Sequence, residues 1–213
     1  MAEKTAPEVY QLHIWIRQIS PMIGRRLLVR SDSTLADLHA VIQIAFGWTD
    51  THLHRFRIHG RDYGVSRIGE PTFAHDAHAV RLDSFQFRRN EWFLYEYDLR
   101  DSWRHQVRVE RHLAAEPRRT YPVCIGGQRA APPEDCGGPW GFLQGRDAVP
   151  GQLREHLERI LENVEAGDRD GLRDELDAVE SLRAWLTLDH FDRRTVNRRL
   201  QLYVAGDERW REP

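Results

Sequence analysis

Residues 92–110, W-F-L-Y-E-Y-D-L-R-D-S-W-R-H-Q-V-R-V-E, decide the fold of the first half of the chain. Residues 92–98 and 103–110 are rich in aromatic and β-branched side chains, which is the composition of β-strands. The link 99–102 is short enough to join the two strands in a hairpin. The stretch therefore predicts an antiparallel pair.

Further strands precede this hairpin. Residues 9–19 alternate between apolar and polar side chains, as a strand with one buried face does. Residues 25–31 read as a second strand, antiparallel to the first, and 52–59 as another. Between them, Ser33 or Thr34 caps a helix that ends at Gly47. The apolar face of the first strand comprises Tyr10, Leu12, Ile14 and Ile16, and its other face carries His13, Trp15 and Arg17.

Helical periodicity replaces strand alternation after Gly141. Apolar residues recur at helical spacing over 153–164 and 172–186, and a short helix is expected over 195–203. The order predicts an α+β fold, with an antiparallel sheet in the N-terminal two-thirds, helices packed on it and a helical C-terminal third. We expect residues 8–204 to form a single domain, because the amphipathic helices need the sheet to cover them. The segments 1–7 and 205–213 are expected to be a disordered and a loose tail.

Composition restricts the class of protein. Hydrophobic residues make up 40% and charged residues 30% of the chain, as in soluble globular proteins. No apolar run approaches the roughly 20 residues of a membrane span, and the N-terminus has no apolar signal segment. A cytoplasmic protein without a membrane partner is the expectation, with its two cysteines reduced. The formal net charge of −2 gives no general attraction to nucleic acid.

Candidate site residues gather in 95–141. Asp98, Asp101 and His105 lie on the hairpin, and Glu134 and Asp135 lie in P-P-E-D-C-G-G. Two carboxylates and an imidazole can bind a divalent cation or act as an acid and a base. Each also has a structural alternative. The hairpin aspartates can be turn residues that bond nearby backbone N–H groups, and His105 can pack beside Trp103 and Val107. Glu134 or Asp135 can cap a helix that starts near Gly138. We predict that all five face one cleft between the 98–105 hairpin and the 122–141 loop.

The cysteines extend the candidate metal set. Cys124 and Cys136 can converge across the loop as two ligands or a redox pair, which gives the set Asp98, Asp101, His105, Cys124 and Cys136. The Cys-x-x-Cys spacing of a structural zinc site is absent, and most free cysteines are small buried hydrophobes. A divalent metal is therefore the candidate cofactor.

Two weaker patterns lie outside this region. His52 and His54 share a strand face, where they can chelate a metal or be ordinary surface residues. Arginines between 193 and 199 form a basic helical patch that can contact phosphates or complement the helix dipole. Asp192 is expected to cap that helix. The common phosphate-loop, nucleophile-elbow, dinucleotide and zincin motifs are absent from the chain.

Several motifs in order make the chain resemble the plasmid pRiA4b ORF-3-like family. They cover most of residues 8–203 and include L-H-A-V-I-Q-I-A-F-G-W-T-D-T-H-L-H-R-F, Y-E-Y-D-L-R-D-S-W-R-H-Q-V, P-P-E-D-C-G-G-P-W-G and F-D-R-R-T-V-N-R-R-L. The resemblance implies a compact α+β domain of uncharacterised function, with some members encoded on plasmids and mobile elements. It supplies no catalytic residues. Arg100 stands where the family pattern Y-D-F-G-D-x-W has glycine, so a different hairpin geometry is expected.

Two functional hypotheses follow. In the first, the protein is an accessory binding or interaction domain linked to mobile elements, with a nucleic acid or a protein as its partner. In the second, it is a metal-dependent hydrolase-like enzyme that uses the carboxylate and histidine cluster. The sequence does not decide between a binding protein and an enzyme.

Overall fold

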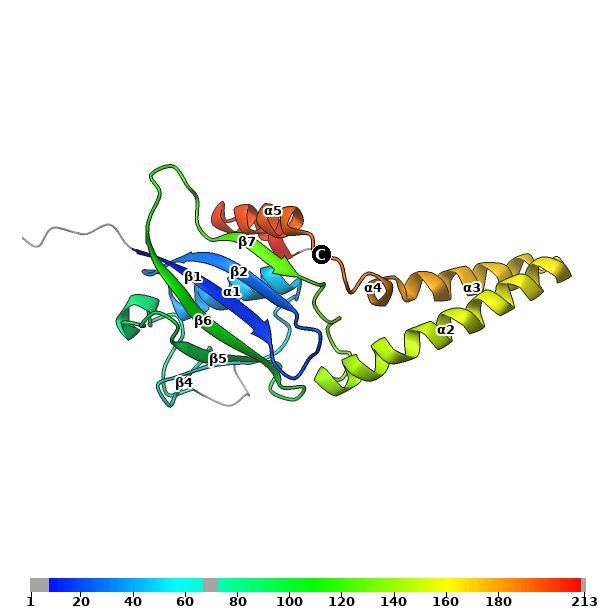
Figure 1. The fold of residues 1–213 in the computed structure, drawn as a ribbon, viewed down its shortest axis with the longest axis horizontal. Coiled ribbons are helices and arrows are strands. Elements are labelled where there is room, and N and C mark those ends of the chain that lie inside the picture. Colours follow the sequence, from blue (N-terminus) through cyan, green and yellow to red (C-terminus); the bar gives the residue numbers. More distant parts are fainter. Residues whose placement is uncertain (1–7, 67–72, 212–213) are drawn as a thin grey trace, which may run out of the picture.

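The computed structural model describes residues 8–66 and 73–211, so the predicted tail 1–7 lies outside the described residues. Its seven strands form an antiparallel sheet in the order β4-β3-β5-β6-β1-β2-β7 (Figure 1). The α+β prediction is confirmed. The strands are β1 (Glu8–Ile16), β2 (Gly24–Arg30), β3 (His54–Ile58), β4 (Arg61–Tyr63), β5 (Trp92–Tyr97), β6 (Trp103–Ala114) and β7 (Val123–Gln128). The helices are α1 (Leu35–Phe46), α2 (Gly138–Ala166), α3 (Arg169–Ser181), α4 (Arg183–Leu186) and α5 (Arg193–Val204).

One face of the sheet carries the core. The apolar face predicted for β1 is buried, with Leu12 and Ile14 at most 1% exposed. The register pairs Tyr95 with His105 and Tyr97 with Trp103 across β5 and β6, and these four side chains are also buried. Aromatic pairs across neighbouring strands add packing contacts beyond simple burial. The β5–β6 hairpin is therefore anchored in the core near its turn.

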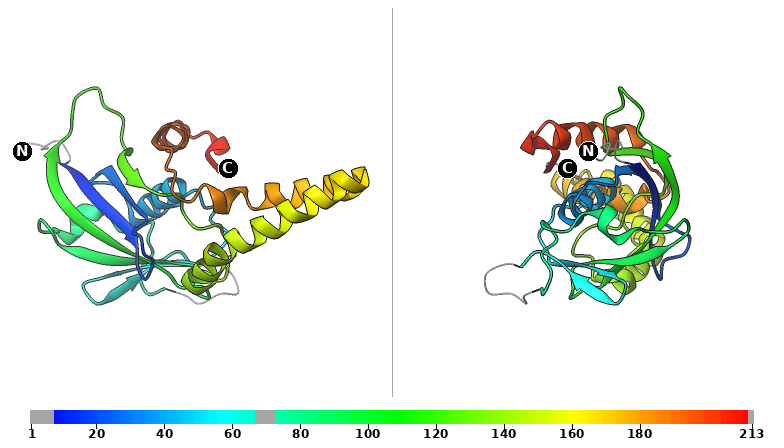
Figure 2. Two further views of the ribbon diagram at one scale, coloured as in Figure 1. Left: turned by 45° about the vertical axis from the view of Figure 1, so that its right-hand side comes forward. Right: turned by 90° about the vertical axis from the view of Figure 1, so that its left-hand side faces the viewer.

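Helix α1 lies inside the curve of this face (Figure 2). Thr34 and Asp37 form a capping box at its start, and Gly47 ends it with a left-handed φ of 77°. The Tyr203 hydroxyl donates a hydrogen bond of 2.9 Å to Asp37 Oδ1, which ties α5 to α1. As predicted, Asp192 caps α5 by accepting from the backbone N–H groups of Arg194 and Thr195.

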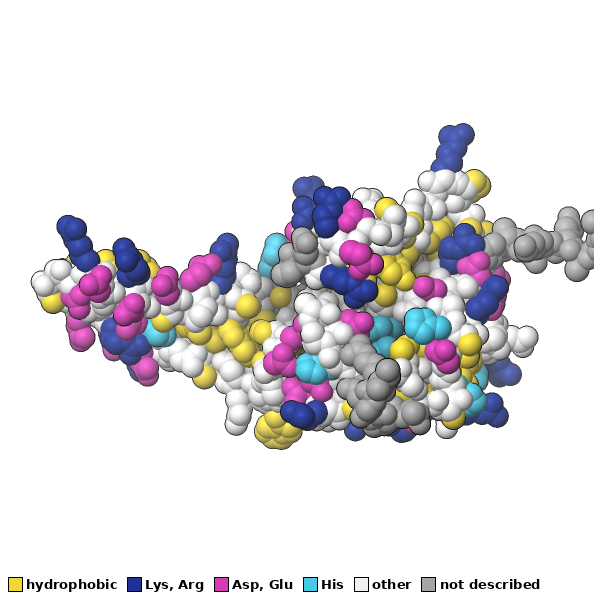
Figure 3. Space-filling view, turned by 180° about the vertical axis from the view of Figure 1, so that it is seen from behind, with side chains coloured by type: hydrophobic (Ala, Val, Ile, Leu, Met, Phe, Trp, Pro, Cys, Tyr) yellow, Lys and Arg dark blue, Asp and Glu magenta, His cyan; other side chains and the backbone are white. Residues whose placement is uncertain are grey.

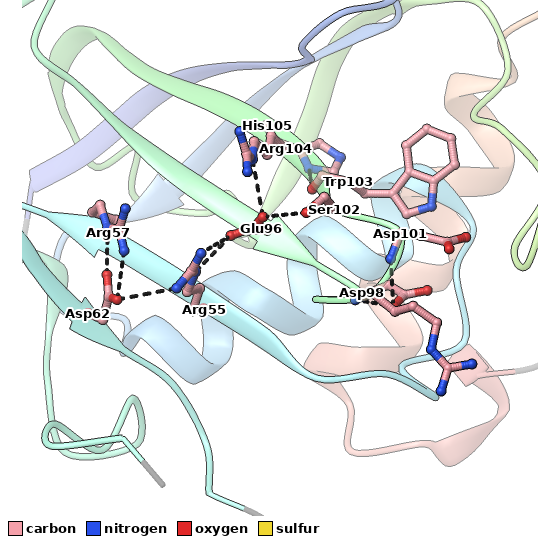
Figure 4. A network of polar contacts seen from close by, with 11 residues as sticks. Arg55, Arg57, Asp62, Glu96, Asp98, Asp101, Ser102, Trp103, Arg104 and His105 are labelled. Atoms are coloured by element: carbon pink, nitrogen blue, oxygen red, sulfur yellow. Dashed lines mark hydrogen bonds and ion pairs between the residues drawn. The ribbon is translucent and has the colours of Figure 1, made fainter. Parts of the chain in front are cut away.

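The opposite face of the sheet is polar around β5. Glu96 is 6% exposed, and its carboxylate accepts hydrogen bonds from Arg55, Ser102 and Arg104 (Figure 4). Beside it, Arg57 and Asp62 form a bidentate ion pair, in which two guanidinium N–H groups donate to the two carboxylate oxygens. Around Glu96, paired charges therefore take the place of apolar packing.

Helices α2 and α3 form an arm that extends away from the sheet (Figure 1). Phe142, near the base of the arm, is buried, and its ring stacks at 5.7 Å on Trp185. Further out, Glu175 of α3 binds His156 and Arg159 of α2. The two helices thus pack mainly against each other rather than beneath the sheet, and Leu161 remains 64% exposed.

Two segments differ from the sequence expectation. The predicted 113–140 loop contains the end of β6 and all of β7, which joins the sheet edge through pairs such as Leu27 with Cys124. The segment expected as a loose tail contains a 3-10 turn, Glu208–Arg211, whose Trp210 is only 5% exposed. Residues 212–213 lie outside the described residues. The prediction of one domain over 8–204 stays a prediction.

Candidate functional site

Three distant segments enclose an open pocket of about 530 Å³. They are the α1–β3 connection, the β5–β6 turn and the glycine-rich segment that leads into α2. Its lining includes His52, Asp98, Arg100, Asp101 and Asp135. Figure 3 shows histidine and acidic side chains close together on the body of the protein, near the base of the arm. Three of the five residues predicted for the cleft, Asp98, Asp101 and Asp135, therefore line one pocket.

Asp98 occupies the first position of the hairpin turn. Its Oδ1 accepts hydrogen bonds of 3.0 Å and 3.2 Å from the backbone N–H groups of Arg100 and Asp101. Because these bonds use Oδ1, Oδ2 is the oxygen that faces His52, 3.8 Å from Nδ1. Asp98 is thus both a turn residue and a pocket residue. The left-handed positions of the turn are Asp98 (φ 51°) and Ser102 (φ 57°), so Arg100 stands in for glycine without strain.

His52 links the two carboxylates. Its Nε2 lies 2.8 Å from Asp135 Oδ1, and one ligand atom from each of His52, Asp98 and Asp135 lies within 4.8 Å of the others. Such a set of one nitrogen and two oxygens can surround a divalent cation. The sequence placed His52 on a strand face beside His54, as a chelating pair or as ordinary surface residues. In the structure His52 precedes β3 and lines the pocket.

Glu134 fixes the neighbouring chain rather than lining the pocket. Its Oε2 accepts from the backbone N–H and hydroxyl of Thr49, at 3.0 Å and 2.6 Å. Its Oε1 accepts a hydrogen bond of 2.6 Å from the Tyr97 hydroxyl. Burial raises the pKa of Tyr97, and the hydrogen bond with the Glu134 carboxylate raises it further. Glu134 therefore holds the glycine-rich segment against the α1–β3 connection.

Gly138 permits the close approach of that segment to the hairpin. It has a φ of 69°, and a Cβ at this position would lie 2.5 Å from the backbone oxygen of Asp101. A side chain cannot fit there without displacing backbone. The glycine pair after Asp135 thus brings α2 against the turn.

His105 lies elsewhere. It is 0% exposed on the core face of β6, where its Nδ1 bonds the Trp103 carbonyl oxygen at 3.0 Å and its ring packs on Phe46 and Trp48. Burial lowers the pKa of His105 to about 3. Figure 4 shows His105 along the strand and Asp98 and Asp101 at the turn. The structure therefore does not bring His105 to the pocket.

The cysteines are also outside the cluster. Cys124 is buried on β7, and its Sγ bonds the Gly126 carbonyl oxygen at 3.4 Å. Burial raises the pKa of Cys136 to about 11, and Asp101 and Asp135 add to the effect. Within residues 8–66 and 73–211, potential ligand atoms form two groups of three, His52/Asp98/Asp135 and His39/Asp50/His54, and neither includes a thiol.

The fold and the site define an α+β protein with an open histidine–aspartate pocket at the end of a hairpin. The sequence matches plasmid pRiA4b ORF-3-like proteins over residues 8–199, so the chain belongs to this family. It is 31% identical over 163 residues to the uncharacterized protein y4hQ of Sinorhizobium fredii, covering 76% of this chain and 84% of that protein. The crystal structure of MM3350, a protein of unknown function from Methanosarcina mazei Go1, matches with a TM-score of 0.63 and 31% identity, over 91% of this chain and 98% of that one.

These relatives identify the family and the fold but name no chemistry. In the part of the chain that the structure describes, no helix has both the length and the apolar character needed to cross a bilayer.

Proposed function

We propose that the pocket binds a divalent cation through His52, Asp98 and Asp135, and that the protein is a metal-dependent hydrolase. The observation that carries the proposal is the convergence of ligand atoms from three separate segments within 4.8 Å. Asp98 is 6% exposed, and its orientation is set by two backbone hydrogen bonds. A preorganised carboxylate loses little freedom when it coordinates a cation.

The pocket suits hydrolysis because it is open to solvent on one side. A cation held there would lower the pKa of a bound water and polarise a substrate oxygen. Asp101 lines the same pocket and would serve as the acceptor of the water proton. Arg100 adds a permanent positive charge at the rim, which favours a substrate that carries a phosphate or a carboxylate group.

Cation binding is tested first. Titration calorimetry and thermal shift with Mn²⁺ and Zn²⁺ should show stabilisation of the wild-type protein, since a ligand of the native state raises its stability. Asp135→Asn should weaken the affinity at least about 10-fold by removing one charged ligand. Asp189→Asn is the matched control, because the Asp189 carboxylate is 90% exposed, pairs with Arg129 and does not belong to the pocket lining. Equal affinity in both variants would reject the site.

Hydrolysis is tested separately. The metal-loaded wild-type protein is assayed against nitrophenyl phosphate mono- and diesters and a nitrophenyl carboxylic ester, with Asp135→Asn and the cation-free protein beside it. Turnover that requires both the cation and Asp135 supports the enzyme. Cation binding without turnover of any of these esters would support the metal site and reject the proposed hydrolase activity.

A second candidate function is that of an accessory domain that binds nucleic acid. It is supported by a groove of about 450 Å³ between β7 and α5, whose lining includes Arg119, Arg193, Arg194 and Arg198. Clustered arginines can neutralise successive phosphates. The formal net charge of −2 means that any binding depends on this local cluster.

Fluorescence anisotropy with labelled DNA at two salt concentrations tests this candidate. Binding should weaken as salt rises, and the Arg194→Ala/Arg198→Ala variant should weaken it further. Arg173→Ala on the arm is the control, because it changes the net charge outside the groove. Binding that is insensitive to salt, or equally weak in the control, contradicts the candidate.

A further inference from the structure

The arm carries apolar side chains that the rest of the chain does not cover. Four of them are at least half exposed, namely Leu157, Leu161 and Val164 of α2 and Leu176 of α3. The structure describes every residue from 150 to 181, and none of them is buried. Figures 1 and 2 show the arm projecting away from the sheet, so cover for these side chains must come from another molecule.

Helical geometry fixes where the α2 residues point. The α2 positions that turn toward α3 are half-buried and comprise Leu153, His156, Ile160 and Asn163. A helix rotates by about 100° per residue, so the stripe of Leu157, Leu161 and Val164 is centred about 90° around α2 from this contact line.

Leu176 of α3 points to the same side of the arm. The contact line of α3 includes Glu175, which binds His156 and Arg159 of α2. Leu176 lies about 130° around α3 from this line, in the same sense of rotation as the stripe on α2. Because the two helices run in opposite directions, this shared sense turns both toward one side. We call Leu157, Leu161, Val164 and Leu176 the apolar arm face.

A two-helix layer with one apolar face is half of a larger bundle. Helix α3 has no buried residue, and an isolated helix of its length is only marginally stable in water. A second pair of helices laid on the apolar arm face would give both pairs a shared core, as in four-helix bundles. The partner that fits is therefore another helical hairpin.

The charges beside the face match a second copy of the same hairpin. Arg173 and Glu180 lie on one flank of Leu176, toward opposite ends of α3. In a copy that runs antiparallel across Leu176, Arg173 of each chain faces Glu180 of the other. A partner hairpin of unrelated sequence would meet this alternation of sign only by chance.

Helix α2 repeats this order of charge. Arg154 and Glu165 lie on the outer flank of its stripe, one toward the base of the arm and one toward its tip. An antiparallel copy brings Arg154 of each chain opposite Glu165 of the other. Glu175 of α3 is level with Arg159 of α2, so the pairs on both helices are centred within about one helical turn of each other. One docking register therefore matches charge on both helices.

The charged groups are free to take new partners. Within one chain, Arg154 lies 3.9 Å from Glu158, and Glu180 lies 2.7 Å from Arg183. All four side chains are at least 65% exposed. Ion pairs this exposed contribute little to stability, so exchanging them across an interface costs little.

The size of the face fits a reversible dimer. Residues 150–166 span about 25 Å of helix, and two adjacent helices are about 20 Å wide. Two such faces bury on the order of 1,000 Å² in total, at the lower end of specific protein interfaces. The fraction of dimer should therefore change with protein concentration.

We propose that the apolar arm face is a self-association surface, through which two copies of this chain form an antiparallel four-helix bundle. The same patch is used on both chains, as two-fold symmetry requires. The two sheets then lie at opposite ends of the bundle. The inference does not rest on the proposed hydrolase or on nucleic-acid binding.

Sedimentation velocity of the full-length protein over a range of micromolar concentrations tests the association. The wild-type protein should pass from monomer to dimer as its concentration rises. Leu161→Glu places a carboxylate within the face, so its dimer dissociation constant should rise at least about 10-fold. Val204→Glu is the matched control, because Val204 is an apolar residue of α5 that is 44% exposed outside the arm. Its dissociation constant should equal that of the wild-type protein.

Charge reversal identifies the partner and the register. Arg173→Glu and Glu180→Arg each set like charges against one another in the antiparallel dimer, so each variant alone should dimerise more weakly than the wild-type protein. Mixed in equal amounts, the two variants should form a heterodimer, because every facing pair then has opposite signs. Both positions are exposed, so the variants should keep the circular dichroism spectrum of the wild-type protein.

Three results would each overturn the proposal. The first is a wild-type protein that stays monomeric at every concentration. The second is a dimer that Leu161→Glu leaves as stable as Val204→Glu does. The third is a mixture of Arg173→Glu and Glu180→Arg that associates no better than either variant alone.

Discussion

His52 and Asp135 are 83 positions apart in the chain, yet His52 Nε2 lies 2.8 Å from Asp135 Oδ1. The contact closes the pocket at the point where the α1–β3 connection meets the entry to α2. It depends on the hairpin turn between them, because the Asp98 carboxylate approaches the other nitrogen of the same imidazole. Changes in the turn should therefore affect both stability and cation binding, and the two effects can be separated.

Substitutions of Asp98 separate its structural role from its ligand role. Asp98→Ala removes an acceptor for two backbone N–H groups at a left-handed position, so it should lower the free energy of unfolding by about 1–2 kcal/mol. Asp98→Asn keeps an oxygen acceptor and tolerates the left-handed conformation. It should unfold almost like the wild-type protein while its Mn²⁺ affinity falls at least about 10-fold. Chemical denaturation and calorimetry give the two readings. Unchanged affinity in Asp98→Asn removes this carboxylate from the ligand set.

Gly138 should be far less tolerant of substitution than Gly126. In Gly138→Ala the new Cβ meets the Asp101 backbone oxygen at 2.5 Å, at a φ of 69°. We expect a loss of about 2 kcal/mol or more of unfolding free energy, and weaker cation binding, because the turn must move. Gly126→Ala is the matched control, since no atom of the described residues lies within 4 Å of its Cβ position. Equal melting temperatures for the two variants contradict the close packing of turn and helix.

Local patterns predicted the sheet well because they are tied to burial on one face. The alternation of β1 and the capping residues around α1 each act over a few positions, so the sequence contains them directly. Strand β7 was missed because V-C-I-G-G lies within a glycine- and proline-rich stretch and pairs only at the sheet edge with β2. The arm was not anticipated either. Amphipathic spacing shows that a helix has an apolar face, but it does not say whether a sheet or a second helix covers it.

The candidate site was partly predictable because some of its residues belong to local turn and glycine-rich patterns. Asp98 and Asp101 were identified from the turn, and Asp135 from its glycine-rich surroundings, and all three line the pocket. His105 was misplaced because alternation along β6 points it to the core, between Trp103 and Val107. His52 was undervalued because its role depends on a contact with Asp135 that no local pattern encodes.

His105 should make the protein less stable in weak acid. Burial lowers its pKa to about 3, whereas an unfolded histidine titrates near 6.5. Below pH 6.5 this histidine is protonated in the unfolded chain but stays neutral in the folded protein. The contribution of the neutral His105 to the free energy of unfolding is therefore fully present above pH 6.5 and is lost as the pH falls toward 3. By pH 5 the loss from this residue should be about 2 kcal/mol.

Urea denaturation at pH 7 and pH 5 measures this effect. His105→Gln cannot be protonated, so its stability should fall less between the two pH values than that of the wild-type protein. His78→Gln, at an exposed position, is the matched control substitution. If His105→Gln and the wild-type protein showed the same pH dependence of stability, the lowered pKa of His105 would be contradicted.

Glu96 should stabilise the hairpin at neutral pH and lose this effect in acid. Burial alone would raise its pKa, but hydrogen bonds from Arg55, Ser102 and Arg104 lower it below 4.5 overall. Its contribution is therefore present above the unfolded pKa and is lost as the pH falls through the lower, folded pKa. Glu96→Gln should cost about 2–3 kcal/mol at pH 7, because charged hydrogen bonds to a buried group are lost. The difference from the wild-type protein should shrink below about pH 4. Glu116→Gln, whose side chain is 65% exposed, should cost less than about 0.5 kcal/mol at either pH. A cost for Glu96→Gln that is the same at pH 7 and pH 3.5 would show that the carboxylate is not ionised in the folded protein.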